Sequence, residues 1–162
     1  MIRIQRSPID VEAVIDSVRR DDAGAIAMFL GTVRADPDVD ALDYEVYKPM
    51  AIRTLADLVD VAKAKFGVIA MSIVHRVGRV SVGSDSVAIA CAAVHRAEAF
   101  SACAWAMDEV KRVVPIWKQE PGRERPQPVA GGPARVERLG RLQRRKDRAG
   151  PQTPRAIGPC RG

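Results

Sequence analysis

The sequence has 162 residues, which is enough for one domain with a sizeable core. Its hydrophobic fraction of 47% and charged fraction of 28% are typical of a globular protein, and its apolar runs are too short to cross a bilayer as helices. The net charge of +6 lies at one end: residues 1–120 hold 15 Lys+Arg against 17 Asp+Glu and carry −2, whereas residues 121–162 hold 11 against 3 and carry +8.

The chain opens with a predicted strand and a predicted helix. The alternation in Ile2–Gln5 favours a short strand. Ser7 followed by Pro8 is typical of a helix N-cap and of the first helical position, where a missing N–H is tolerated. Apolar residues then recur at helical spacing, which predicts a helix that continues to about Arg19.

Two strands and a long helix are predicted next. Residues 24–33 form an apolar run that suits a strand, residues 42–47 alternate as a strand does, and residues 35–40 between them have the composition of a turn. Residues 50–66 repeat apolar side chains at steps of three and four, which indicates an amphipathic helix that ends at Gly67.

The last predicted elements are two strands and a second long helix. Residues 68–77 and 86–94 favour strands that are joined by a glycine-containing connection, and residues 97–113 favour a helix that Pro115 ends. Helices are interspersed among the strands, and no Gly-x-Gly-x-x-Gly turn is present. This order predicts an α+β fold rather than a doubly wound dinucleotide-binding fold.

The composition changes after residue 120. Residues 121–162 contain 7 of the 11 prolines and 7 of the 12 glycines, together with many arginines and no aromatic residue. Such a segment cannot bury enough apolar surface to offset the entropy lost on ordering. We therefore predict one domain over residues 1–120, followed by a basic tail over residues 121–162 that is largely disordered.

The cysteines and histidines bear on compartment and on metal binding. Cys91, Cys103 and Cys160 form no Cys-x-x-Cys pair and are odd in number, which fits buried thiols in a reducing compartment. His75 and His95 lack metal-ligand spacing, so no metal site is expected. The first residues lack the apolar core of a signal peptide, and the cytoplasm is therefore the expected location.

Several cationic side chains within residues 1–120, the nearly neutral part of the chain, lie where predicted apolar elements end. Arg34 ends one predicted strand, and His95 and Arg96 end another directly before a helix, whose N-terminus favours anions. Lys111 lies near the C-terminus of that helix, and Lys118 follows the proline that breaks it. Together they suit a phosphate or carboxylate site, but taken singly each is more often a solvated or ion-paired residue.

Six strings in the sequence, in the same order and spacing, resemble the large subunit of molybdopterin synthase. The resemblance covers roughly residues 1–120. The strings are Phe-Leu-Gly-Thr-Val-Arg at 29–34, Leu-Asp-Tyr-Glu-Val-Tyr at 42–47, Met-Ala at 50–51, His-Arg-Val-Gly at 75–78, Val-His-Arg-Ala-Glu-Ala-Phe at 94–100, and Pro-Ile-Trp-Lys-Gln-Glu at 115–120.

The resemblance implies a reaction, a fold and partners. That family converts cyclic pyranopterin monophosphate to molybdopterin by inserting two sulfurs as a dithiolene. The sulfur arrives as a thiocarboxylate on the C-terminal Gly-Gly of a small ubiquitin-like partner, whose tail enters a pocket of the large subunit. The implied fold is the α/β-hammerhead, the implied assembly is a heterotetramer around a dimer of large subunits, and no metal or organic cofactor is implied.

The resemblance also assigns roles to residues of this sequence. Lys118 matches the essential lysine and Lys111 matches a second active-site lysine. We hypothesise that Lys118 has the main acid–base role, while Lys111 assists and helps to hold the thiocarboxylate tail. The remaining matches are the positions that bind anions and substrate, Arg34, His95 and Arg96, and those that line the pocket, Phe29 and Met107.

The sequence departs from the family pattern after Glu120. Family members usually end soon afterwards in a Trp-Val pair, and that region supports the pocket across the dimer. Here the ending is rich in Arg, Pro, Gly and Ala, as a GC-rich coding sequence translated out of frame would be. We hypothesise a frameshift or a recent replacement of the ending, which resequencing of the coding region tests.

Two other functions are compatible with the sequence. The basic tail at residues 121–162 allows non-specific, salt-dependent binding to nucleic acid or another anionic surface, although aromatic residues and a nucleic-acid-binding motif are lacking. Alternatively, the chain is a non-catalytic scaffold that binds the small partner but lost its activity with the altered ending.

Overall fold

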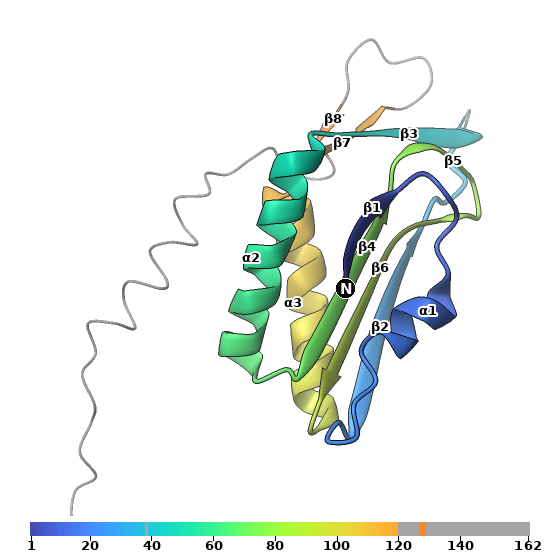
Figure 1. The fold of residues 1–162 in the computed structure, drawn as a ribbon. Coiled ribbons are helices and arrows are strands. Elements are labelled where there is room, and N and C mark those ends of the chain that lie inside the picture. The colour runs from blue at the N-terminus through green and yellow to red at the C-terminus, as the bar shows by residue number, and fades with distance from the viewer. Residues whose placement is uncertain (38, 120–126, 129–162) are drawn as a thin grey trace, which may run out of the picture.

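The computed structural model describes residues 1–37, 39–119 and 127–128. A mixed four-stranded sheet has the order β1-β4-β6-β2, in which β1 and β4 are parallel and the other pairs antiparallel. Two helices cover one face of this sheet and a short helix lies on the other (Figure 1). The strands of this larger sheet are β1 (Ile2–Gln5), β2 (Ala25–Thr32), β4 (Ala70–Arg76) and β6 (Asp85–Ala93), and the helices are α1 (Val11–Asp16), α2 (Lys48–Phe66) and α3 (Arg96–Val113).

The two central strands of the larger sheet are buried on both faces. Side chains of β6 alternate between the two cores: Ile89 and Cys91 face α2 and α3, whereas the small side chains of Ala88, Ala90 and Ala92 face α1. Central strands of this kind appear in the sequence as continuous apolar runs, because neither face requires polar residues. The backbone of these central strands is therefore held in place on both faces, and so are the residues at the ends of the strands.

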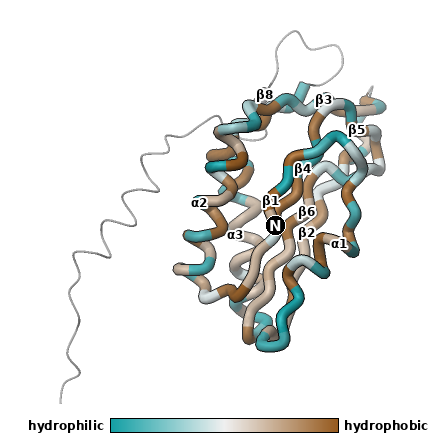
Figure 2. The backbone as a smooth tube through the Cα atoms, viewed as in Figure 1, coloured by the Kyte–Doolittle hydropathy of each residue, from teal (hydrophilic) through white to brown (hydrophobic). Residues whose placement is uncertain are grey.

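Helix α2 has the amphipathic pattern that its sequence predicts. Leu55 and Leu58 are fully buried against the sheet and α3. Hydrophilic and hydrophobic segments alternate along the helix, as Figure 2 shows. Gly67 ends it in the left-handed conformation with φ of 68°, and its N–H donates to the carbonyl of Lys63 at 2.9 Å. The predicted end at Gly67 is confirmed, and the helix begins two residues earlier than predicted.

A second, smaller sheet lies across one end of the first (Figure 1). It has the order β5-β3-β7-β8, and β3 pairs antiparallel with both β5 and β7. Neither β5 nor β7 was predicted, because each is only four residues long, and β5 begins with a glycine while β7 directly follows a proline. The strands are β3 (Ala41–Val46), β5 (Gly78–Ser81), β7 (Ile116–Gln119) and β8 (Gln127–Pro128).

The prediction for the first helix was wrong at both ends, because α1 begins at Val11 rather than at Pro8 and ends at Asp16 rather than near Arg19. The N-cap is Asp10, whose carboxylate accepts a hydrogen bond from the N–H of Ala13 at 3.0 Å. Ser7 and Pro8 lie outside the helix, and their carbonyls accept hydrogen bonds from the Gln5 side chain at 3.2 and 2.9 Å. The local signal of a serine followed by a proline was overridden by a better cap three residues later.

The α+β class that the sequence predicts is confirmed by these two sheets and three helices. Within the described residues, no helix combines the length and the apolar character that a membrane span requires. The predicted domain over residues 1–120 contains every described element except β8. The predicted disorder of residues 121–162 lies outside the described residues, apart from Gln127–Pro128, whose backbone pairs with β7.

Candidate active site

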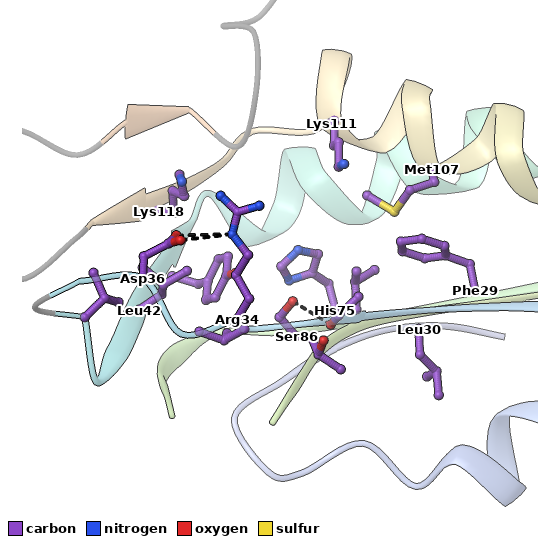
Figure 3. A pocket seen from close by; sticks show the side chains of 16 residues that line it. Phe29, Leu30, Arg34, Asp36, Leu42, His75, Ser86, Met107, Lys111 and Lys118 are labelled. Carbon is purple, nitrogen blue, oxygen red and sulfur yellow. Dashed lines mark hydrogen bonds and ion pairs between the residues drawn. The ribbon is translucent and has the colours of Figure 1, made fainter. Parts of the chain in front are cut away.

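A cavity of about 440 Å³ lies where the larger sheet, the C-terminal end of α3 and the smaller sheet meet. Its walls come from β2 and the loop that follows it, from β3, β4, β6 and β7, and from the last turns of α3. Five of the seven residues that the sequence nominated line it (Figure 3). They are Phe29, Arg34, Met107, Lys111 and Lys118.

The two lysines reach the cavity from different elements. Lys111 is exposed in the last turn of α3, and Lys118 is partly buried in β7. Pro115 lies between them and prevents the helix from continuing, so Val114 is extended and β7 starts at Ile116. The chain therefore turns from the helix into the smaller sheet, and both side chains approach the cavity (Figure 3).

Lys118 is fixed by the register of the smaller sheet. It lies directly opposite Tyr44 of β3, and the backbone of β8 pairs with it on the other side at Gln127. Directly opposed residues of antiparallel strands project from the same face, so Lys118 and Tyr44 share the face that lines the cavity.

Arg34 provides a third cation at the mouth of the cavity. Its Nε lies 3.2 Å from both carboxylate oxygens of Asp36. The side chains of Arg34 and Asp36 are 83% and 50% exposed, so this ion pair contributes at most about 1 kcal/mol. The guanidinium lies between Lys111 and Lys118 in Figure 3, and an incoming anion can displace the weak contact with Asp36.

Phe29 and Met107 form an apolar wall. Phe29 belongs to β2, and Met107, which is 6% exposed, belongs to the face of α3 that packs on the sheet. A flat aromatic group suits such a wall, because ring and thioether contacts are favourable and require no hydrogen bonds. The cavity thus combines cations at its mouth with an apolar side.

A β-bulge in β6, opposite the end of β2, lies beside the cavity. The register between β2 and β6 shifts between Gly31 and Thr32. A Cβ on Gly31 would lie 2.6 Å from Cγ1 of Val87, so glycine is required there by the closeness of β6. Ser86 donates its hydroxyl hydrogen to the carbonyl of Gly31 at 2.9 Å and holds the bulge. Bulges of this kind commonly redirect side chains next to active sites.

His75 lines the floor of the cavity, and the sequence assigned it no role. It is 2% exposed, and its Nδ1 lies 2.7 Å from the carbonyl oxygen of Arg76. Burial lowers the pKa of His75 to about 4, although the backbone hydrogen bond opposes this shift. The ring of Tyr44 packs edge-on against it, with 5.5 Å between centroids. The string at 75–78 was the signal that pointed to this position.

The structure does not bring His95 and Arg96 to the cavity. His95 occupies the N-cap position of α3 without a side-chain capping hydrogen bond, Arg96 begins the helix, and both are exposed. Arg96 and Lys111 belong to the same helix, and a separation of fifteen residues corresponds to roughly 22 Å along its axis. Neither His95 nor Arg96 is among the described residues that line the cavity. Within a single chain, the seven nominated residues therefore form two groups.

Comparison with known proteins identifies the family. The model of the MoaE protein family matches residues 4–113. The chain belongs to the MoaE family. It is 45% identical over 122 residues to the molybdopterin synthase catalytic subunit of Thermoplasma volcanium, a match that covers 74% of this chain and 89% of that protein. The Arabidopsis thaliana protein of the same name is 44% identical over 115 residues, covering 69% of this chain and 58% of that longer protein.

Solved MoaE-family structures have the same fold. The molybdopterin synthase structure from Staphylococcus aureus superposes with a TM-score of 0.71 at 34% identity, covering 76% of this chain and 93% of that one. The MoaE protein from Burkholderia ambifaria gives a TM-score of 0.72 at 34% identity, covering 88% and 97%. The fold that the sequence resemblance implied is therefore confirmed.

The cavity of this MoaE-family chain suits an anionic ligand with a flat ring. Three cations surround its mouth and an apolar wall forms one side. Fixed cations in a partly enclosed site stabilise developing negative charge more effectively than water does. Among the described residues, no group of three His, Cys, Asp or Glu side chains is placed to hold a metal ion.

Proposed function

We propose that this chain is the catalytic subunit of a molybdopterin synthase, which inserts two sulfurs into cyclic pyranopterin monophosphate to form the dithiolene of molybdopterin. The observation that carries the proposal is the convergence of Lys111, Lys118 and Arg34 on one cavity in a MoaE-family chain. The cations match the cyclic phosphate of the substrate, and the wall formed by Phe29 and Met107 matches its ring system.

The two lysines differ in surroundings, which supports different roles. Lys118 is partly buried within a sheet, so its position relative to a bound substrate is well defined. We assign it the main acid–base role at the substrate during sulfur transfer. Lys111 is exposed on the last turn of α3, where it can follow an incoming chain. We assign it the supporting role of holding the thiocarboxylate.

The proposed sulfur donor is a small ubiquitin-like partner with a C-terminal Gly-Gly thiocarboxylate. A tail of two glycines carries no side chains, so it can pass the loop around Arg34 and reach the cavity. The cations at the mouth complement the negative charge of the thiocarboxylate. A structure from Helicobacter pylori with the same fold, at a TM-score of 0.68 and 19% identity, is a complex of subunits 1 and 2 of a molybdopterin-converting factor.

We further propose that His95 and Arg96 act at the cavity of a second copy of this chain. Both are exposed at the end of α3 opposite to Lys111, where the neighbouring side chains Val94 and Phe100 are 53% and 65% exposed. A two-fold axis that places this end of one copy beside the cavity of the other completes both sites at once. Two such large subunits and two small partners form the proposed heterotetramer.

The proposed compartment is the cytoplasm. Cys91 and Cys103 are free and buried between β6 and α3, as expected of a protein that folds in a reducing environment. The alternative of binding to nucleic acid through residues 121–162 concerns a segment outside the described residues, apart from Gln127–Pro128.

The decisive experiment combines purified chain, thiocarboxylated small partner and cyclic pyranopterin monophosphate, and measures dithiolene formation. We expect turnover by the unaltered chain and its loss in Lys118→Ala. Lys63→Ala is the matched control, because Lys63 is exposed on α2 and does not line the cavity. Co-purification with the partner without any dithiolene product would favour the scaffold alternative, and normal turnover by Lys118→Ala would overturn the assignment of Lys118.

A further inference from the structure

His75 is the most deeply buried of the described polar side chains that line the cavity. It is 2% exposed, compared with 6% for Ser86 and 8% for Tyr44. It lies near the end of β4, a central strand that is hydrogen-bonded to neighbours on both sides. Its backbone therefore cannot move without disturbing the larger sheet, and its ring has a fixed place at the floor of the cavity (Figure 3).

The hydrogen bond of Nδ1 determines the tautomer of His75. The carbonyl oxygen of Arg76, 2.7 Å away, can only accept a hydrogen bond, so Nδ1 carries the hydrogen. The ring is neutral at physiological pH, because its pKa is lowered to about 4 by burial. Nε2 then carries no hydrogen and is an acceptor, on the side of the ring away from Arg76.

The charged side chains of the cavity do not duplicate this neutral acceptor, whereas the hydroxyls of Thr32, Tyr44 and Ser86 can both donate and accept. Arg34, Lys111 and Lys118 are cations that only donate hydrogen bonds. The carboxylate of Asp36 is paired with Arg34 at the mouth. Donors are thus gathered at the exposed mouth, and His75 presents an acceptor at the buried floor. A ligand that satisfies both has an anionic group directed outwards and an N–H or O–H directed inwards.

We propose that His75 is a substrate-binding residue, whose Nε2 accepts a hydrogen bond from an N–H of the substrate's heterocycle while the cations at the mouth hold its phosphate. This inference rests on the proposed function, because it takes the substrate to be a pterin phosphate. The contact fixes which edge of the heterocycle faces inwards. It also makes the site selective, since a ring without a donor at that edge leaves a buried acceptor unpaired.

Two substitutions separate this role from a structural one. His75→Asn retains a donor near the position of Nδ1 and lacks any acceptor at the position of Nε2, whereas His75→Gln can place its amide oxygen near that position. We expect His75→Asn to raise the KM for the pterin precursor roughly ten-fold or more, with a smaller change in kcat, and His75→Gln to recover part of the loss. Equal losses in kcat for both, with unchanged KM, would show a structural role and overturn the proposal.

A measurement on the unaltered chain avoids any fault in folding of the variants. The sequence has two histidines, so a protein with ¹⁵N-labelled histidine gives side-chain signals from His75 and His95 alone, and His95→Gln assigns them. We expect the Nε2 signal of His75 to be that of an unprotonated nitrogen. Titration with the pterin precursor should shift it, whereas inorganic phosphate, which we expect to bind at the mouth, should leave it in place.

The outcomes distinguish this inference from the proposed function. An Nε2 that is protonated in the free protein, or that does not respond to bound precursor, overturns the role of His75 even if the enzyme turns over. A response of Nε2 to the precursor in a chain that transfers no sulfur supports the role of His75 and overturns the catalytic function. A chain that binds no precursor overturns both.

Discussion

The two ends of α3 both carry basic and large apolar side chains, but their surroundings are opposite. At the C-terminal end, Met107 is 6% exposed and Lys111 faces a cavity bounded by both sheets. At the N-terminal end, Phe100 is 65% exposed, and His95 and Arg96 lie on the open surface. One end of the helix is thus enclosed by its own chain, and the other presents a phenylalanine and two basic side chains to the surroundings.

This difference shows that residues which share a family pattern need not share a site within one chain. A phenylalanine at 65% exposure beside basic residues is unusual on a monomer's surface and typical of an interface. We interpret the enclosed end as the site that the chain builds alone. The open end is the part that we propose it contributes to another copy. The experiments below test that division, from the largest expected effect to the smallest.

Lys118→Ala should have the largest effect, because it removes the proposed acid–base group at the enclosed end. We expect dithiolene formation to fall roughly 100-fold or more. Thermal unfolding should change little, since the lysine is only partly buried. The assay is product formation with saturating partner, beside Lys63→Ala. If Lys63→Ala lowered dithiolene formation by the same factor, the loss in Lys118→Ala could not be assigned to the cavity.

Mixing two inactive variants tests whether the open end acts across copies. Lys118→Ala alters the cavity and Arg96→Ala alters the N-terminal end of α3, so a mixed dimer keeps one intact site and one doubly altered site. After the two are unfolded and refolded together in equal amounts, about a quarter of the normal activity should return, because half of the dimers are mixed and each has one working site. No recovery, with mixed dimers shown to form, would place Arg96 at the site of its own chain. An active Arg96→Ala protein would place Arg96 outside the chemistry.

The buried His75 should link the stability of the chain to pH. The pKa of His75 is about 4 in the folded chain, below the ordinary value of 6.5, so the unfolded chain binds more protons between these values. The free energy of unfolding should therefore fall by up to roughly 3 kcal/mol as the pH drops from about 6.5 to about 4, and level off below. Chemical denaturation of the unaltered chain and of His75→Gln at several pH values measures this difference.

His95 provides the control for that experiment. His95→Gln makes the same substitution at an exposed position of the open end of α3, and it is measured alongside His75→Gln. Equal slopes for His75→Gln and the unaltered chain between pH 4 and 6.5 would contradict the neutral, buried state of His75. That result would also weaken the assignment of its Nε2 as an acceptor.

Phe100→Ser should have the smallest effect on the isolated chain. The side chain is 65% exposed, so the free energy of unfolding should change by less than about 0.5 kcal/mol at concentrations where the chain is monomeric. Self-association, measured by analytical ultracentrifugation, should weaken clearly. Unchanged self-association would exclude this end of α3 from the contact between copies.

The sequence predicted most of the fold, because the long elements have strong periodic patterns. Helix α2 and the central strands β4 and β6 were recognised from apolar spacing alone. The short strands β5 and β7 were not, since four residues are too few for a period and their pairing with β3 depends on distant segments. The first helix was placed wrongly because Ser7 and Pro8 gave a stronger local signal than Asp10.

The site was predicted in part for a similar reason. The resemblance nominated Lys118, which lies in the string at 115–120, and Lys111, which lies outside the strings. No pattern in the sequence shows that the Tyr44 ring contacts His75. His75 was given no role, because a histidine within an apolar run is usually structural. Its tautomer and its place at the cavity floor depend on the backbone geometry at Arg76. The separation of His95 from Lys111 likewise required the length and direction of α3.

The pairing of β7 with a strand on each side limits how the length of the segment before Lys118 can change. Lys118 lies between Tyr44 and Gln127 in a sheet whose side chains alternate between faces. A residue inserted or deleted between Pro115 and Lys118 would therefore not move the lysine by a small distance. It would turn the lysine to the opposite face and present Trp117 or Gln119 to the cavity instead. A change in the length of this strand therefore either keeps Lys118 in the cavity or removes it completely. Substitutions around the strand can instead change the cavity by small steps.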